Sequence, residues 1–387
     1  MIYLDHHAST PCDPQVLEAM LPYFTSQFGN PSSLHKAGMR TFDAVQQSRE
    51  QVAVLIGAQP GEVIFTSGAT EANNLALLGY ARAAKLTNSR RRIVISAIEH
   101  KAIINPGKQL AREGFEVVTI PVNSDGKVKV DFARNAINSE TLLVSIQAAN
   151  GEIGTIQPIS ELSQLAHAAG AIMHTDAAQA VGKIPVNIMA WGVDMLSLSG
   201  HKLYGPQGIG ALIVRNPRRT QMEPLAYGGG QERGWRSGTP NVPGIVGLGA
   251  ACARCNELQQ DENAHLAVLR DEFENLMLSA IPESFRNGDL QNRLPNNSSI
   301  TFPELEADAL LARLPSLALS TGSACDAGTI EPSSTLISIG LSRSDARSTI
   351  RIGLGRFSSR SDISQASSLI IKQVLELKRL GAKLGIG

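Results

Sequence analysis

Residues 195–202 read Met-Leu-Ser-Leu-Ser-Gly-His-Lys, a mostly apolar run that ends in small and polar residues. Similar runs recur along the chain, and segments with apolar residues at helical spacing, such as 160–169, lie between them. The runs cover residues 63–66, 93–95, 117–120, 142–146, 171–174, 195–198 and 209–214. Strands that alternate with helices in this way predict an α/β fold, with a mostly parallel seven-stranded sheet flanked by helices.

The periodicity breaks in the Gly- and Pro-rich stretch 227–244, and the pattern beyond it is different. A helical pattern over 246–278, a strand pattern over 298–302 and an amphipathic segment over 362–380 predict a smaller α+β unit. The first residues of the chain either join this unit or lie across the entrance of a site, and the sequence leaves both open.

Length and composition set further limits. The chain has 387 residues, which suits a large domain over 15–255 and a small domain over 1–14 and 256–387. Its 35 Lys and Arg balance 35 Asp and Glu, so direct binding of nucleic acid is not expected.

The N-terminus is polar by its fifth residue and no long apolar stretch follows, so we expect a cytoplasmic protein without membrane contact. The four cysteines form neither a disulfide framework nor a metal-ligand set, and no metal is expected.

Polar residues follow the runs at the points where the strands end. In parallel sheets these ends share one edge, where ligands bind. The turn at 67–74 opens a helix and suits a phosphate, although an ordinary strand-to-helix turn has the same pattern. The other ends carry Glu99, His100, Gln147, Glu152, Asp176, Gln179, Ser199, His201 and Lys202. A lysine beside a phosphate site, a carboxylate for a ring nitrogen and an imidazole that can stack on a ring indicate pyridoxal phosphate chemistry.

Longer motifs extend this indication over nearly the whole chain. They are YLD at 3–5, FGNPSSLH at 28–35, SGATEANN at 67–74, EIGTIQP at 152–158, SGHK at 199–202, RSGT at 236–239 and STGSAC at 320–325. Together, and in this order, they resemble the cysteine desulfurases of the NifS/IscS type, in the class V aminotransferase superfamily. The resemblance implies the type I fold of pyridoxal-phosphate-dependent transferases, pyridoxal 5'-phosphate as cofactor, L-cysteine as substrate and a homodimer with a shared active site.

The resemblance also implies roles for individual residues. Lys202 would form the Schiff base with the cofactor and then move the substrate α-proton. Asp176 would pair with the pyridinium nitrogen, and His100 would stack on the ring and assist proton transfer. The phosphate would be held by Ala69, Thr70, Ser199, His201 and, from the other subunit, Thr239.

Two positions depart from the family pattern. Gly151 stands where relatives commonly have a second asparagine, whose amide contacts the phenolic oxygen of the cofactor. Either Asn150 provides this amide, or Gln179 and water do. The other departure is the pair His6-His7, which replaces an amide-rich sequence and could alter substrate access. Adjacent residues in a strand point to opposite faces, so this pair is not expected to share a metal ion.

The remaining implied residues act on the substrate. Cys325, in a Gly- and Ser-rich loop, would take sulfur from the substrate as a persulfide. Arg351 would clamp the substrate carboxylate through its two-pronged geometry, with help from Asn30. Cys252 and Cys255 lie three residues apart in a helical pattern, which favours packing over a redox or metal pair.

The implied function is cysteine desulfuration, with sulfur passed to a protein acceptor. Iron-sulfur cluster assembly, tRNA thiolation and DNA phosphorothioation all draw on this family, and the sequence does not choose between them. A selenocysteine lyase or another class V aminotransferase-type enzyme would not need Cys325 for turnover on cysteine. An inactive sulfur-carrier subunit is the non-enzymatic alternative.

Overall fold

The computed structural model describes residues 1–321 and 331–384. Its largest sheet has seven strands in the order β2-β8-β7-β6-β5-β3-β4. They are β2 (Val63–Thr66), β3 (Arg92–Ser96), β4 (Glu116–Ile120), β5 (Thr141–Ser145), β6 (Ile172–Asp176), β7 (Met195–Ser199) and β8 (Gly210–Val214). Only β8 pairs antiparallel with its neighbours in this sheet. Each run expected from the sequence overlaps one strand, so the predicted α/β fold is confirmed.

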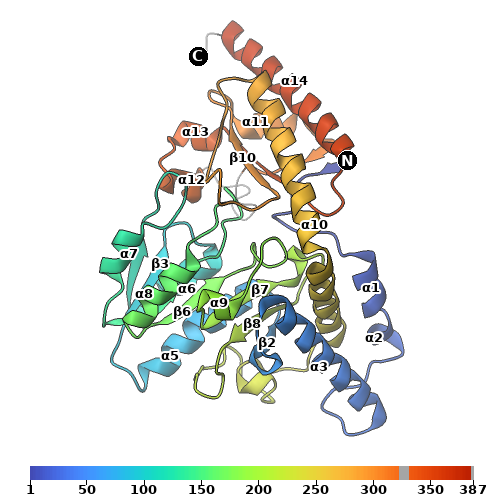
Figure 1. The fold of residues 1–387 in the computed structure, drawn as a ribbon, viewed down its shortest axis with the longest axis vertical. Coiled ribbons are helices and arrows are strands. Elements are labelled where there is room, and N and C mark those ends of the chain that lie inside the picture. Colours follow the sequence, from blue (N-terminus) through green and yellow to red (C-terminus); the bar gives the residue numbers. More distant parts are fainter. Residues whose placement is uncertain (322–330, 385–387) are drawn as a thin grey trace.

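Helices cover both faces of this sheet (Figure 1). They are α1 (Pro14–Met20), α2 (Pro22–Thr25), α3 (Lys36–Ile56), α4 (Ala69–Asn74), α5 (Tyr80–Lys85), α6 (Lys101–Arg112), α7 (Val130–Ala136), α8 (Ile159–Ala168), α9 (Ile188–Trp191) and α10 (Val242–Ala280). Successive strand residues enter different cores: Phe65 and Leu196 pack with α3, α8 and α10, whereas Ile64 and Met195 pack with α4, α5 and α6. The alternation follows from the two-residue repeat of a strand.

A second unit lies above the large sheet in Figure 1. It contains the three-stranded sheet β12-β10-β9 and the parallel pair β1-β11. Its elements are β1 (Ile2–Tyr3), β9 (Phe285–Arg286), β10 (Asn297–Thr301), α11 (Ala307–Ala312), β11 (Leu317–Ala318), α12 (Ser334–Ser338), α13 (Arg343–Arg347), β12 (Thr349–Gly353) and α14 (Arg360–Leu384). The expected helical, strand and amphipathic patterns correspond to α10, β10 and α14. The pairing of β1 with β11 joins the first residues to this unit.

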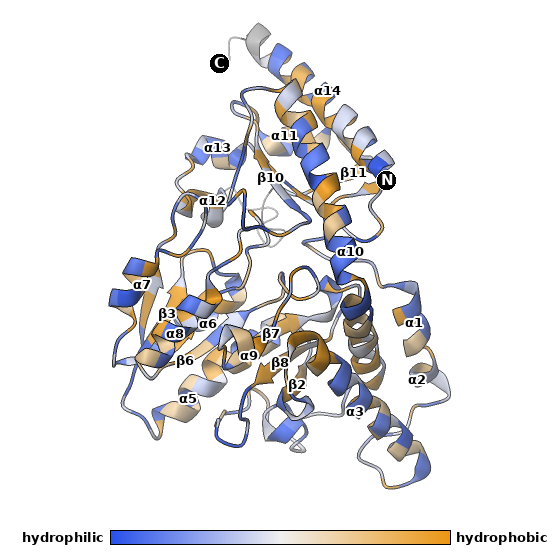
Figure 2. Ribbon diagram, in the orientation of Figure 1, coloured by the Kyte–Doolittle hydropathy of each residue, from blue (hydrophilic) through white to orange (hydrophobic). Residues whose placement is uncertain are grey.

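The helix α10 connects the two units. Its residues up to Cys255 pack in the core of the large sheet, and those from Leu266 onward pack with β10, β12 and α14. Polar residues interrupt the apolar ones along α10 and α14 (Figure 2). Within 1–321 and 331–384, no helix carries an apolar stretch able to cross a membrane.

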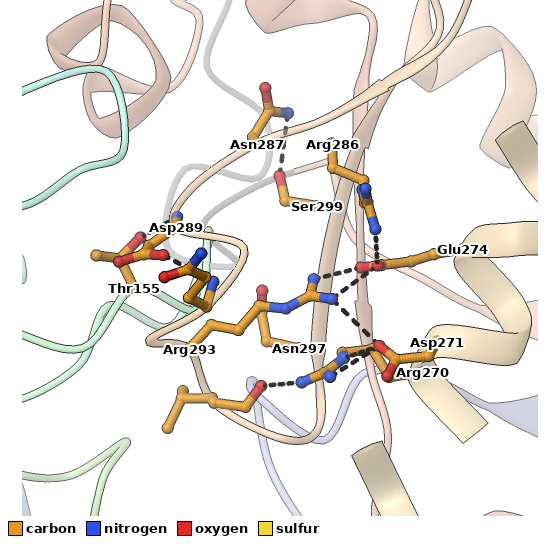
Figure 3. Close-up of polar contacts among 12 residues, drawn as sticks. Thr155, Arg270, Asp271, Glu274, Arg286, Asn287, Asp289, Arg293, Asn297 and Ser299 are labelled. Atoms are coloured by element: carbon orange, nitrogen blue, oxygen red, sulfur yellow. Dashed lines mark hydrogen bonds and ion pairs between the residues drawn. The ribbon is translucent and has the colours of Figure 1, made fainter. Parts of the chain in front are cut away.

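The loop between β9 and β10 fastens the second unit to the first (Figure 3). The backbone N–H of Asp289 donates to Thr155 Oγ1 at 3.0 Å, and that of Leu294 donates to the carbonyl of Gly154 at 2.8 Å. Arg293 Nη1 lies 2.6 Å from Glu274 Oε1 on α10. The segment 150–157, which follows β5, is therefore held from both units.

Candidate active site

One edge of the large sheet collects the residues expected to be functional. The strands β2, β3, β5, β6 and β7 all run in the same direction, because β2 and β7 are each antiparallel to β8 and the other pairs are parallel. Their carboxyl ends therefore share this edge. Asp176 ends β6, and Lys202 and His100 follow β7 and β3.

Asp176 is held by two hydrogen bonds. Asn73 Nδ2 on α4 donates to Oδ2 at 2.7 Å, and the backbone N–H of Ala178 donates to Oδ1 at 3.0 Å. Asp176 is 7% exposed and Asn73 is fully buried. Donors of this kind stabilise the carboxylate and fix its orientation. Our sequence reasoning missed Asn73, although it lies within the motif at 67–74.

Lys202 faces the N-terminal segment of the chain. Its Nζ donates to the carbonyl of His7 and, at 2.8 Å, to the carbonyl of Ala8. Thr10 anchors this segment, since its backbone N–H and its Oγ1 donate to the carbonyl of His201 at 2.9 and 3.0 Å. The first residues therefore contact Lys202 and His201 as well as joining the small unit.

The turn between β2 and α4 forms a cradle lined by small residues. Gly68 has a φ of 151°, which L side chains rarely adopt, and a Cβ built on it would lie 3.8 Å from Ser199 Oγ. Ala69 and Thr70 open α4, where N–H groups of the first turn lack helical partners. Burial, followed by the charges of neighbouring lysines, lowers the pKa of His201 to about 4, so its ring is neutral near pH 7.

Gln179 makes contacts with three groups beside Lys202. Its Oε1 lies 3.0 Å from Lys183 Nζ and 3.0 Å from His7 Nδ1, and its Nε2 donates to the carbonyl of His7 at 3.0 Å. A Cβ at Gly151 would lie only 2.7 Å from Gln179 Nε2. The missing side chain at position 151 therefore makes room for Gln179.

Asn150 is used within its own turn. Its Oδ1 accepts from the backbone N–H groups of Glu152 and Ile153 at 2.8 and 3.0 Å, and its Nδ2 donates to the carbonyl of Ile98 at 3.3 Å. These bonds commit both ends of a buried amide to the backbone. Of the two amides considered from the sequence, Gln179 is the one whose side chain reaches the groups around Lys202.

His100 and Glu99 follow β3 in different environments. His100 is exposed and caps α6, where its Nδ1 accepts from the backbone N–H of Ala102 at 3.1 Å. The Glu99 carboxyl is buried and accepts from the backbone N–H of Gln147 at 2.9 Å. Burial raises the pKa of Glu99 to about 8, so this carboxyl is mostly protonated at neutral pH.

Arg351 lies on β12, where the two units meet. Its side chain is buried; Nη2 donates to Asp5 Oδ1 at 2.7 Å and Nη1 to the carbonyl of Gly151 at 3.3 Å. Asn30 is exposed in the loop before α3. Figure 1 shows that loop at the opposite end of the molecule from β10, the partner of β12, so a single chain does not bring Asn30 to Arg351.

The comparisons with known proteins agree with this geometry. The family model described as aminotransferase class V matches residues 2–366. The chain belongs to the class V aminotransferase family.

Two relatives and two solved structures give a finer comparison than the family model. The cysteine desulfurase IscS of Rickettsia typhi is 43% identical over 381 residues, which cover 98% of this chain and 92% of the relative. The mitochondrial cysteine desulfurase of Arthroderma benhamiae is 44% identical over 380 residues, covering 98% and 75%. A solved NifS-like protein superposes with a TM-score of 0.89 at 33% identity, covering 98% and 99%. The structure titled SspA in complex with cysteine has a TM-score of 0.82 at 37% identity, covering 93% and 100%.

The cysteines of this class V aminotransferase chain differ in environment. Cys325 lies outside the described residues. Cys252 and Cys255 are buried in α10, where burial raises both thiol pKa values, that of Cys255 to about 11, so they are packing residues as expected. Among residues 1–321 and 331–384, no cluster of side chains is suited to hold a metal ion, and His6 and His7 lie in a turn after Asp5 rather than in a strand.

Ser320, near the end of the described segment 1–321, lies beside Arg351. Ser320 is 8% exposed, and its carbonyl accepts from the backbone N–H of Arg351 at 2.7 Å.

Thr239 is exposed in the segment before α10. The nearby Arg236 pairs at 3.0 Å with Glu71 on α4, so this segment reaches the cradle of its own chain.

Proposed function

We propose that this protein is a pyridoxal-phosphate-dependent cysteine desulfurase that converts L-cysteine to alanine and passes the sulfur from Cys325 to a protein acceptor. One observation carries the proposal. A lysine, a carboxylate oriented by two hydrogen bonds and a glycine turn beside a serine gather at one sheet edge, in a chain 43% identical to an IscS cysteine desulfurase.

The residues at this edge fit the cofactor. Among the described residues, a Cβ built on Gly68 would contact only Ser199 Oγ, at 3.8 Å, so this cradle is lined by small groups, as a phosphate site needs. Asp176, oriented by its two donors, would pair with the ring nitrogen, and Thr70 and His201 would complete the phosphate site. When bound, the cofactor supplies the electron sink that allows bonds at the substrate Cα to break. Lys202 would provide the amine that holds it.

The amino acid would be oriented by side chains of this chain. Arg351 would bind the substrate carboxylate in place of Asp5, and Lys202 would move the α-proton. His100 would face the cofactor ring with its Nε2, since its Nδ1 caps α6. Gln179 would lie near the phenolic oxygen, because Asn150 is committed to the backbone.

The sulfur step needs a nucleophile, and we assign it to Cys325. Its thiolate would attack the substrate sulfur, forming an S–S bond while the C–S bond breaks and the electron pair returns to the substrate carbon. Protonation of that carbon yields alanine, and the persulfide remains on the enzyme. Transfer to an acceptor thiol then restores Cys325. The acceptor stays open among iron-sulfur scaffold, tRNA-thiolation and DNA-phosphorothioation proteins.

A homodimer is the proposed assembly. Apolar side chains with at least 47% exposure gather on α1, α2, the following loop and the start of α3, which adjoin one another in Figure 1. They are Leu17, Leu21, Phe24, Phe28, Leu34, Met39 and Phe42. A second copy covering this face would remove them from water. It would also give Asn30 and Thr239, both exposed in one chain, a site to complete across the interface.

Two further expectations stay proposals. The division into 15–255 and 1–14 with 256–387 agrees with the change of core along α10 between Cys255 and Leu266. A cytoplasmic location remains a prediction from the sequence.

The decisive experiment compares wild type and Cys325→Ala with L-cysteine, measuring alanine and sulfide. We expect the variant to keep a cofactor absorbance near ~420 nm and to lose sulfide release. Lys202→Ala should lose that absorbance. Undiminished turnover in Cys325→Ala would instead indicate a lyase or another class V enzyme. A wild type that cannot be reconstituted with the cofactor would indicate an inactive carrier subunit.

A further inference from the structure

Shortly after Lys202, the backbone adopts a conformation that is rare for a large side chain. Tyr204 has a φ of 62°, in the left-handed region that suits glycine, and the residue is 6% exposed. A tyrosine stays in this conformation only where the surrounding contacts hold it there. Backbone strain of this kind is common at functional sites, and the proposed function assigns no role to Tyr204.

The backbone of Tyr204 is bonded to the N-terminal segment. Its N–H donates to Thr10 Oγ1 at 2.8 Å, and its carbonyl accepts from the backbone N–H of Asp13 at 2.9 Å. The same Thr10 Oγ1 donates to the carbonyl of His201 at 3.0 Å. Thr10 therefore bonds to the backbone on both sides of Lys202, and the conformation of Tyr204 sets the direction in which the chain continues.

The side chain of Tyr204 is held by Arg356, in the loop that follows β12. Its hydroxyl accepts from the backbone N–H of Arg356 at 2.5 Å, and the guanidinium carbon of Arg356 lies 4.2 Å from the centre of its ring. A cation over the face of an aromatic ring is attracted to it, and more strongly when both are removed from water. Arg356 therefore contacts both the hydroxyl and the ring.

Two carboxylates fix the Arg356 guanidinium over that ring. Its Nη1 lies 2.6 Å from Asp13 Oδ2, and its Nε lies 2.9 Å from Glu262 Oε2 on α10. The three side chains are at most 11% exposed, so solvent screens these ion pairs little. Glu262 lies in the part of α10 that connects the two cores. Arg356 therefore joins the small unit, the connecting helix and the N-terminal segment to Tyr204.

The contact also joins the two elements that carry the main candidate residues. Arg351 lies on β12, shortly before Arg356, and would bind the substrate carboxylate. Lys202 lies in the loop after β7, shortly before Tyr204, and would move the α-proton. Proton transfer is efficient only between groups held in the right geometry, so the relative position of these two elements matters for turnover.

We infer that Tyr204 and Arg356 are positioning residues, which together hold the Lys202 amine in a fixed position relative to Arg351. The inference rests on the proposed function, in which Lys202 binds the cofactor and Arg351 binds the substrate. The role requires neither Tyr204 nor Arg356 to touch the reacting atoms. Tyr204 acts through the backbone next to Lys202, and Arg356 acts through the loop that follows β12.

The decisive comparison is between Tyr204→Phe and Tyr80→Phe. The first variant keeps the ring and removes the acceptor of the Arg356 N–H. The second removes a hydroxyl from a pocket that includes the first residues of β6 and β7, at the opposite edge of the sheet. In the full chain freed of cofactor, hydrogen exchange at amides 200–205 should become about fivefold faster in Tyr204→Phe, as expected for the loss of one hydrogen bond. It should not change in Tyr80→Phe.

Turnover separates positioning from a general loss of stability. In the holoenzyme of Tyr204→Phe, kcat for alanine formation should fall about fivefold, while KM for L-cysteine changes by less than about twofold because Arg351 is intact. Arg356→Lys keeps a positive charge between Asp13 and Glu262 but loses the planar group over the ring. It should show the same pattern of faster exchange and lower kcat, and it also serves if Tyr204→Phe does not fold.

Any of three results would overturn the inference: unchanged exchange at amides 200–205, a lower kcat/KM that comes from KM alone, or faster exchange that extends equally to β6. The last is what a merely structural role predicts. Failure of the proposed function is distinct, because it would appear in the wild type as an absence of alanine formation. Failure of this inference alone would leave the wild type active.

Discussion

Arg293→Met should destabilise the small unit more than any change to a surface ion pair. Glu274 on α10 is fully buried, and Arg293 Nη1 and Nη2 lie 2.6 and 2.9 Å from its two oxygens (Figure 3). Methionine fills similar space with no charge. The variant therefore leaves the Glu274 carboxylate in the interior without its main partner.

The expected loss in the free energy of unfolding can be worked from these contacts. Removing one partner of a buried ion pair usually costs about 3–5 kcal/mol. Here Arg286, whose side chain is 32% exposed, still reaches Glu274 at 3.3 Å and offsets part of that cost. We therefore expect Arg293→Met to lower the free energy of unfolding of the small unit by about 2–4 kcal/mol.

A double-mutant cycle separates the pair from the packing of each side chain. Urea unfolding is followed for Arg293→Met, Glu274→Met and the double variant, with hydrogen exchange in the loop 287–296 reporting the small unit. The double variant buries no unpaired charge, so its loss should be smaller than the sum of the single losses. Arg360→Met is the control, because its pair with Glu272 is exposed and should contribute under about 1 kcal/mol.

A loss below about 1 kcal/mol in Arg293→Met, or losses that simply add in the double variant, would refute this reasoning. Either result would mean that Glu274 does not depend on Arg293 in the folded chain. The loop would then be held mainly by its backbone bonds to Gly154 and Thr155.

Three further predictions concern the site. Asn73→Leu removes a charge-assisted bond to Asp176 worth about 1.5–3 kcal/mol, so alanine formation from cysteine should slow roughly 10- to 100-fold; an unchanged rate would contradict the role given to Asn73. Gly151→Ala puts a Cβ 2.7 Å from Gln179 Nε2 and should lower kcat/KM about fivefold, the equivalent of one hydrogen bond, while the urea midpoint stays close to wild type. The pKa of Lys183 is about 7 when folded and about 10.4 when unfolded, so the unfolded chain binds more protons between these values and stability rises with pH there. Lys183→Met should therefore be more stable than wild type at pH 6, and urea titrations should show that advantage disappearing by about pH 10.

The large sheet was predictable because its strands are buried on both faces. Such strands appear as continuous apolar runs, and the run at 195–198 coincides with β7 almost residue for residue. Asp176 and Lys202 were also predictable, since residues that follow parallel strands must share an edge. Local sequence carries both signals.

The partners of these residues were not predictable in the same way. Asn73 meets Asp176 only because α4 packs across the end of β6, and the two are 103 positions apart. Asp5 meets Arg351 across 346 positions. Lys183 follows an ordinary turn, and only the folded chain shows that its amine is buried beside that of Lys202. Contacts set by tertiary packing leave no periodic trace in a single sequence.

The pair of Asp5 and Arg351 bears on how a substrate would enter. Asp5 contacts Nη2 alone, and among the described residues Nε has no hydrogen-bond partner although it is buried. The Nε–Nη2 edge can bind a carboxylate through two parallel bonds, and Asp5 accepts from only one of its two donors. A substrate carboxylate that displaces Asp5 and also engages Nε exchanges one negative charge for another while adding a bond. The exchange gives the buried Nε–H a hydrogen-bond partner and keeps Arg351 paired with an anion. The net gain in binding free energy therefore comes from the new bond to Nε, because the ion pair itself is only exchanged.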